Sequence, residues 1–460
     1  MDRMSESEVT MILDTYMYTD YEYASDEQTL MEIVQQMPEH IDVEDKYLKE
    51  YSILKEAVKN PKVGELKITC QAQKMGFNKG TNAVAFQSQS TDKLYVIYRG
   101  TADGEWVDNA NGLVKSQTLQ QKEAVAYFDE VIENLGVTGK TQVYVGGHSK
   151  GGNKAQFVAM ESKNYKLINA AYSVDGQGHS DAAIDRWKKK YSSKEYEERV
   201  DKIYAINGEN DFVNVLGNNI VKESHRIYIK TGNESWDMAG YHDITAMFAR
   251  SGVDQNGKRI TTYSAKRNPQ AIDCGKLSMC VGAISEEVMN LEPQKRDGAT
   301  RTLMEACEVL NGNKIRGVNG EFTEFGDIFD FIAAGIPAIG AGLASKEGTS
   351  LVKTIMNNGQ FKRRISDTSS LEINYMKMAQ SAAVLDNTVR KIESNACRIE
   401  QSGMAIPMYF NGYSFRKPHI ENSVVVLLEM ARKLKKIAAI EQEAALIYQK
   451  FDMEALDILK

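Results

Sequence analysis

Residues 142–160, QVYVGGHSKGGNKAQFVAM, join an apolar run to a glycine-rich turn and then to a helix-like segment. The run at 143–145 is β-branched and aromatic, as expected of a buried strand. It ends at two glycines, and a serine follows between Gly147 and Gly151. A strand, a sharp turn and a helix are therefore predicted in that order, with Ser149 on the turn.

Strand-like and helix-like segments alternate on both sides of this turn. The strand-like segments are short, β-branched or aromatic, and bounded by glycine, asparagine or aspartate. They cover 65–72, 82–88, 93–100, 142–147, 167–176, 201–208 and 225–232. Helical patterns cover 5–60, 119–135, the residues from 150 onward, and 181–191. Such alternation predicts the α/β class, with a largely parallel sheet covered by helices on both faces.

The composition is that of a globular chain without a basic character. Of 460 residues, 42% are hydrophobic, and the formal net charge is −7. This length favours two domains, and the charge gives no reason to expect a nucleic-acid partner. Five scattered cysteines form neither a CxxC zinc pattern nor an even disulfide framework, so we expect reduced thiols, no metal and no cofactor. The N-terminal segment MDRMSESEVTMIL lacks an apolar signal core, so classical secretion is not expected.

Beyond about residue 260 the pattern changes, and we expect the strands to stop there. A glycine-rich stretch contains the apolar run 331–344, which is too short to span a membrane and is interpreted as a connector, with contact to a lipid surface as the alternative. Two heptad seams, at 371–402 and 422–456, predict an antiparallel helical hairpin. The predicted domains are an α/β domain with N-terminal helices at 1–260, a helical extension at 261–316, a Gly-rich linker at 317–366 and an all-α helical hairpin at 367–460.

A Gly-x-Ser-x-Gly pattern after a strand and before a helix is typical of a nucleophile elbow. The glycines let the strand and the helix pack closely, so that the hydroxyl of Ser149 projects above the sheet. The N-terminus of the following helix stabilises negative charge beside it. The pentapeptide alone is a weak signal, because a glycine-rich turn without chemistry has the same letters. The predicted strand and helix around it favour a nucleophile.

A nucleophilic serine needs a base, and the histidines of the chain are His40, His148, His179, His225, His242 and His419. His242 follows the last predicted strand and precedes a helical segment, which is where this architecture carries its base. His179 is the rival, although it comes only one strand after the serine. His148 lies inside the turn and His225 opens a strand, so neither is expected to be the base.

The base needs an acid to orient it, and chain order requires that acid between the serine and the histidine. Asp211, in AINGENDFVNVLG, comes just after the predicted strand 201–208. Asp175 ends the preceding strand and is the main rival, and Glu209 is a weaker one. An aspartate after a strand is also common as a cap or turn residue.

An oxyanion site needs two backbone donors. One is expected from Lys150, the residue after the nucleophile, and the other from the bend after the strand 93–100, where Thr101 lies. The alternative for this bend is a plain loop.

Four segments carry a family resemblance: LYVIYRGTADGEWVDN, GGHSKGGNKA, YSVDGQGHSD and NGENDFVNVLG. They resemble the motif blocks of class 3 lipases, in the order of that family, over about residues 65–250. The family consists of α/β hydrolases that cleave acyl esters of lipids. The resemblance implies a catalytic triad of Ser149, Asp211 and His242.

The same resemblance implies Thr101 and Lys150 as oxyanion donors. Lys150 departs from the leucine that is commoner at this position of the elbow and looks like a bacterial branch of lipase-like hydrolases. Phe212 and Val213 replace the proline that usually follows the triad aspartate. The acyl pocket of the family is therefore not transferable to this chain.

The C-terminal segment resembles, more weakly, the helical hairpins of LXG-type and WXG-type substrates of type VII secretion, although those usually come first in the chain. This resemblance implies small helical partner or chaperone proteins, export without a classical signal peptide, and an antibacterial effector toxin with an immunity protein. The alternative is a regulatory or dimerising coiled coil in a cytoplasmic protein.

The elbow predicts a nucleophilic serine, and the resemblance to class 3 lipases implies a serine-dependent hydrolase of lipid acyl esters, with a phospholipase of the A type as the expected enzyme. Two alternatives stay open. One is an esterase, thioesterase, peptidase or acyltransferase on the same elbow, and the other is a non-catalytic α/β scaffold that binds a helical partner.

Overall fold

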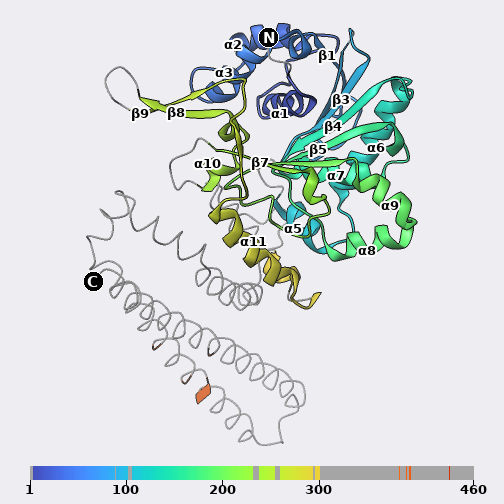
Figure 1. Ribbon diagram of the computed structural model, residues 1–460, viewed down its shortest axis with the longest axis vertical. Helices are drawn as coiled ribbons and strands as arrows, with labels where there is room; N and C mark the ends of the chain where they lie inside the picture. Colours follow the sequence, from blue (N-terminus) through green and yellow to red (C-terminus); the bar gives the residue numbers. More distant parts are fainter. Residues whose placement is uncertain are drawn as a thin grey trace, which may run out of the picture. The chain divides into compact units, whose positions relative to one another are not determined.

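The structure is a computed structural model that describes residues 4–88, 90–101, 106–231, 238–253, 259–293 and 296–300, together with five isolated helical positions beyond residue 380 (Figure 1). The chain divides into two units, residues 1–351 and 352–460. The predicted linker at 317–366 and the predicted helical hairpin at 367–460 lie outside the described residues, apart from those five positions. The first unit carries everything described below.

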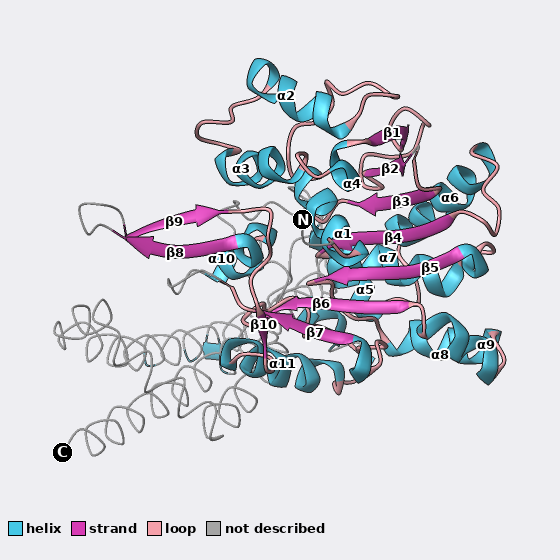
Figure 2. Cartoon of the chain, turned by 45° about the horizontal axis from the view of Figure 1, so that its top comes forward, coloured by secondary structure: helices cyan, strands magenta, loops and turns pink. Residues whose placement is uncertain are grey.

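Within the part of the chain that the structure describes, eight strands form one mixed sheet, ordered β1-β2-β3-β4-β5-β6-β7-β10 (Figure 2). Their bounds are β1 Leu66–Gln71, β2 Ala83–Ser88, β3 Lys93–Tyr98, β4 Gln142–His148, β5 Ile168–Val174, β6 Ile203–Gly208, β7 Arg226–Ile229 and β10 Gln270–Ala271. Strands β3 to β7 are parallel neighbours, whereas β1, β2 and β10 pair antiparallel. The predicted α/β class is confirmed as a mixed sheet with flanking helices, and the expectation of a largely parallel sheet holds only for its centre.

Alternation along the strands fills a core on each face of the sheet. On β3 and β4, Tyr95, Ile97 and Tyr144 belong to one core, and Val96 and Val145 belong to the other. Because both faces are covered, these strands read as nearly continuous apolar runs, which is why the sequence identifies them.

The first face is covered by the N-terminal helices (Figure 1). These are α1 Glu6–Tyr16, α2 Leu30–His40, α3 Leu48–Ala57 and α4 Pro61–Gly64. Capping boxes at Ser5 with Glu8 and at Thr29 with Glu32 fix the starts of α1 and α2. The carboxylate of Glu6 binds Lys62 and Lys93, so α1 is tied to α4 and to the start of β3.

The second face is covered by helices between the parallel strands. They are α6 Leu119–Asn134, α7 Lys150–Glu161, α8 Asp181–Lys190 and α9 Ser193–Val200, with α5 Trp106–Val114 near the ends of the parallel strands. The 3₁₀ turns are η1 Tyr165–Leu167, η2 Glu223–His225 and η3 Ile244–Phe248. The sequence did not predict α5 or α9.

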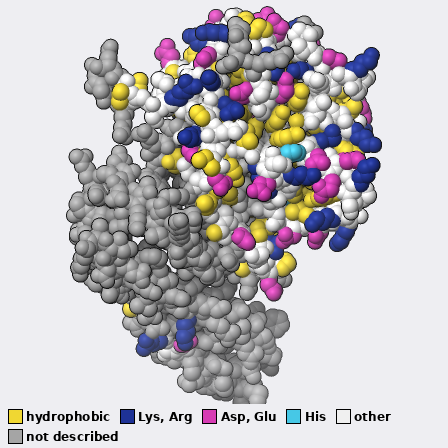
Figure 3. Space-filling model, viewed as in Figure 1, with side chains coloured by type: hydrophobic (Ala, Val, Ile, Leu, Met, Phe, Trp, Pro, Cys, Tyr) yellow, Lys and Arg dark blue, Asp and Glu magenta, His cyan; other side chains and the backbone are white. Residues whose placement is uncertain are grey.

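The expectation that strands stop near residue 260 is wrong. β8 Ala249–Val253 and β9 Arg259–Tyr263 form a two-stranded hairpin, and β10 joins the main sheet beside β7. Helices α10 Met238–His242 and α11 Lys276–Met289 complete the described elements, and α11 lies within the range of the predicted helical extension at 261–316. Within the described residues, no helix combines the length and the apolar character needed to cross a membrane. On the face drawn in Figure 3, basic and acidic side chains are interspersed.

Candidate active site

The turn between β4 and α7 holds Ser149 in a conformation that few residues other than glycine adopt, with φ 58° and ψ −123°. Close packing enforces it. A Cβ on Gly147 would lie 2.3 Å from the carbonyl carbon of Gly151, and a Cβ on Gly151 would lie 2.0 Å from the carbonyl oxygen of Tyr98. The N–H of Ser149 donates to the carbonyl of Val174 on β5 at 2.8 Å. The two glycines of the pattern are therefore spatial requirements of the elbow.

A histidine and an aspartate from two later segments of the chain lie beside this serine. His242 ends α10, and its Nε2 lies 2.8 Å from Ser149 Oγ. Its Nδ1 lies 2.6 Å from Asp211 Oδ1, in the segment that follows β6. A carboxylate only accepts, so Nδ1 carries the hydrogen and Nε2 is left to accept the serine hydroxyl. The three side chains predicted from chain order form one hydrogen-bonded relay.

The aspartate is rigidly held. Asp211 is fully buried, and its second oxygen accepts from the N–H groups of Val213 and Asn214 at 2.9 and 2.7 Å. The amide of the Asn214 side chain adds a third donor at 2.8 Å. Three donors on one oxygen orient the carboxylate and leave the other oxygen for His242.

The rival histidines have other roles. His179 is buried against Trp187, and its Nδ1 lies 3.3 Å from the Asn153 amide. Burial, and then the charge of Lys150, lower the pKa of His179 to about 3, so the ring stays neutral. His225 stacks on Tyr204 and bonds to the Ile203 carbonyl. Neither is bonded to Ser149 as His242 is.

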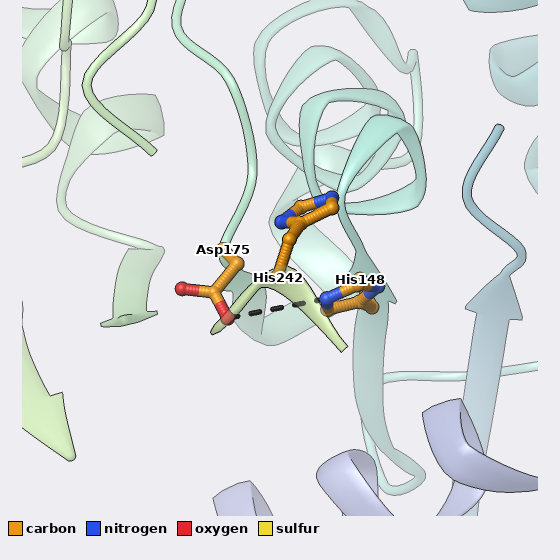
Figure 4. A group of neighbouring side chains, drawn as sticks. All are labelled: His148, Asp175 and His242. Carbon is orange, nitrogen blue, oxygen red and sulfur yellow. Dashed lines mark ion pairs between the residues drawn. The ribbon is translucent and has the colours of Figure 1, made fainter. Parts of the chain in front are cut away.

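Asp175, the rival acid, contacts β6 and His148. Asp175 accepts from the N–H of Gly208 at 2.7 Å, and its other oxygen lies 3.9 Å from Nε2 of His148 (Figure 4). Burial, and then the nearby Asp211, raise the pKa of Asp175 well above its usual value. Burial, and then His242, lower the pKa of His148 well below its usual value. Both groups are thus held neutral beside the catalytic candidates. Nδ1 of His242 pairs with Asp211 and with neither Asp175 nor Glu209.

His148 supports the imidazole of His242 from the side. The two ring centroids are 4.8 Å apart, and the hydroxyl of Tyr18, from the segment after α1, forms a hydrogen bond of 2.6 Å with Nδ1 of His148. Sequence reasoning missed this contact, since Tyr18 lies 130 residues from His148 and no motif joins them.

The donor atoms of His148, Asp175 and His242 lie within 4.8 Å of one another, the spacing of a metal site. Both nitrogens of His242 are nevertheless bonded, to Ser149 and Asp211, and Nδ1 of His148 is bonded to Tyr18. A metal here would displace the relay, so the arrangement fits a hydrogen-bonded support better than a metal centre.

The predicted oxyanion donors flank the serine in the chain fold. Lys150 is the first residue of α7, where a backbone N–H has no intrahelical partner. The hydroxyl of Thr101, just after β3, accepts from the side chain of Asn109 on α5 at 2.8 Å. A Cβ on Gly100 would lie 3.1 Å from Cβ of Ser149, so the Thr101 segment passes close to the serine.

Comparison with known proteins gives one family match and one similar solved structure. The sequence profile of a family described as Mbeg1-like matches residues 57–240, a stretch that includes Ser149 and Asp211 and ends two residues before His242. Among solved structures, the chain is similar to a fungal lipase–inhibitor complex, from work on interfacial activation in lipases. The identity is 12%, the match covers 57% of this chain and 85% of that chain, and the TM-score is 0.28. No curated protein matches.

The strain at Ser149 gives a testable consequence. Ser149→Gly relieves the positive φ, whereas Ser149→Ala keeps it, so the glycine variant should be about 1 kcal/mol more stable than the alanine variant after the larger entropy of unfolded glycine is subtracted. Thermal and denaturant unfolding of both variants measures the difference. An alanine variant as stable as the glycine variant would mean that the elbow stores no strain.

Proposed function

We propose that the protein is a serine-dependent hydrolase of lipid acyl esters. The observation that carries the proposal is the relay from Ser149 Oγ through His242 to the buried Asp211, with contacts of 2.8 and 2.6 Å. A hydrolytic serine needs a base within hydrogen-bond reach and a third group that orients the base. Similarity to the Mbeg1-like family and the resemblance to class 3 lipases support the choice of an ester hydrolase.

The proposed reaction has two halves. Ser149 Oγ attacks the ester carbonyl while His242 Nε2 takes the hydroxyl proton, and Asp211 stabilises the resulting imidazolium. The tetrahedral oxyanion is stabilised by donors at Thr101 and Lys150. His242 then gives its proton to the leaving alcohol, and an acyl-enzyme remains. Water, deprotonated by His242, releases the carboxylic acid and restores the serine.

The neutral groups beside His242 suit this chemistry. The imidazolium formed during attack pairs with one carboxylate, Asp211, while the neutral ring of His148 adds no like charge. Asp175, held neutral by burial, does not compete with Asp211 for the imidazolium.

The relay is tested by side-chain replacement. Ser149→Ala and His242→Ala should each lower kcat for a chromogenic ester by about 10⁴-fold or more, because residues of a triad act as a unit. Asp211→Asn should lower it by a similar factor, since it removes the acceptor that fixes the tautomer. Asp175→Asn is the matched control and should retain most activity. Strong loss with Asp175→Asn and little with Asp211→Asn would reassign the acid.

Within this function, we propose a phospholipase of the A type. The support is the resemblance to lipases that act on glycerolipids. The purified full chain should release fatty acid from phospholipid vesicles, and the rate on one ester should rise sharply once that ester passes its solubility limit. Equal rates on short soluble and long aggregated esters would favour an ordinary esterase or thioesterase instead.

The heptad seams at 371–402 and 422–456 support a further proposal: the C-terminal segment binds small helical proteins for export, as in an exported effector toxin. Co-purification of the full chain with small helical proteins co-expressed from the same source tests it. A full chain that stays without partner and acts in the cytoplasm would favour a regulatory coiled coil.

A further inference from the structure

The side chain of Lys150 is buried, although it directly follows the proposed nucleophile. Only 1% of it is exposed, and its Nζ lies 2.8 Å from Oδ2 of Asp108 on α5 and donates to the Asp108 carbonyl at 3.1 Å. A lysine seldom lies fully buried unless it is paired, because removing the ammonium from water is costly. The leucine common at this position in lipase elbows fills space but cannot bond to α5.

The segment around α5 is shaped to receive this ammonium. Thr118 donates to the same oxygen of Asp108 at 2.9 Å and so fixes the carboxylate. A Cβ at Gly112 would lie 3.2 Å from Nζ of Lys150 and 2.8 Å from the amide nitrogen of Gln177. Glycine at this position lets α5 approach the lysine closely.

The next residue of α5 holds the second oxyanion candidate. Asn109 is buried, its carbonyl accepts from Gln177 at 3.1 Å, and its side-chain amide donates to Thr101 Oγ1 at 2.8 Å. Thr101 is thus hydrogen-bonded to Asn109, and Lys150 is paired with the preceding residue, Asp108. These polar contacts join Lys150 and Thr101 to adjacent residues of α5.

We propose that the Lys150 side chain is a positioning group for the oxyanion site. Its backbone N–H is one donor, and its ammonium anchors the helix that positions the other donor, at Thr101. One residue thereby sets the distance between both halves of the site. The proposal rests on the hydrolase function proposed above, and it assigns a role to a lysine that the relay itself does not use.

The test replaces the charge but keeps the backbone donor. Lys150→Met, Asp108→Asn and the double variant are compared with the wild-type full chain, with Lys163→Met as the control because Lys163 forms an exposed ion pair with Glu133. The double variant leaves no unpaired buried charge, so it keeps the protein folded if Lys150→Met alone does not. Thermal unfolding verifies the fold of each protein.

Ester hydrolysis and a boronic acid inhibitor, which forms a tetrahedral adduct on the serine, give the readouts. Both single variants and the double variant should lose about 10- to 100-fold in kcat, somewhat less than the loss of a whole oxyanion donor. KM and the pH midpoint of kcat should stay close to wild type, while the boronic acid affinity should fall in parallel with kcat. The loss of kcat in the double variant should not exceed the larger loss of the two single variants, since each substitution breaks the same Lys150–Asp108 pair.

Three outcomes would overturn the proposal. A folded double variant with wild-type kcat would show that the pair only stabilises the fold. A loss of kcat with unchanged boronic acid affinity would show that the loss does not arise at the oxyanion site. A loss of kcat in Lys163→Met as large as that in Lys150→Met would show that the effect is not specific to Lys150. If the wild type itself neither hydrolyses esters nor binds the boronic acid, the proposed function fails first. An active wild type beside unaffected variants refutes the positioning role alone.

Discussion

The close approach of β4, α7 and the end of β3 is the constraint on which the site depends. Gly147 and Gly151 meet backbone to backbone, and Gly151 also lies against the Tyr98 carbonyl. No side chain fits between these segments, so the chain must turn sharply and Ser149 must take a positive φ. Substituting either glycine would push the strand and the helix apart and move the serine away from His242. Close packing thus maintains the strained backbone of Ser149, which directs its hydroxyl toward His242.

The N-terminal helices have a part in this arrangement beyond covering the sheet. α1 packs over β3 and β4, and the segment after it delivers Tyr18 to His148 beside the imidazole of His242. Glu6 ties the start of α1 to Lys62 and Lys93. Burial would raise the pKa of Glu6, but bonds from these lysines and from Tyr95 outweigh it and hold the pKa below its usual value. Helix α1 is therefore fixed to α4 and β3 by the ion pairs of Glu6, and the segment after it contacts the site through Tyr18.

The sequence predicts the features that local patterns encode. Strands β3 to β6 are apolar runs bounded by turn residues. Chain order and loop position favour Asp211 and His242, which the structure joins to Ser149, but they leave Asp175, Glu209 and His179 open as rivals. Tyr18 beside His148 and Asp108 beside Lys150 arise from tertiary packing between distant segments, which no periodicity records. The sequence pattern does not predict the hairpin β8–β9, because residues on both faces of the hairpin are exposed. Its strands therefore lack the alternation of apolar and polar residues that marks a half-buried strand. Helix α9 is short and polar, with Arg199 and Val200 as its buried residues, so it lacks the apolar stripe by which a longer helix is recognised.

The central claim is that Ser149 is a nucleophile activated by His242. Its most direct test is the mass of the full chain after treatment with a fluorophosphonate, followed by peptide mapping. The account predicts one phosphonyl group per chain, located on the peptide that contains Ser149, and a much slower reaction for His242→Ala. An unmodified wild-type chain, or a label on another residue, would contradict it.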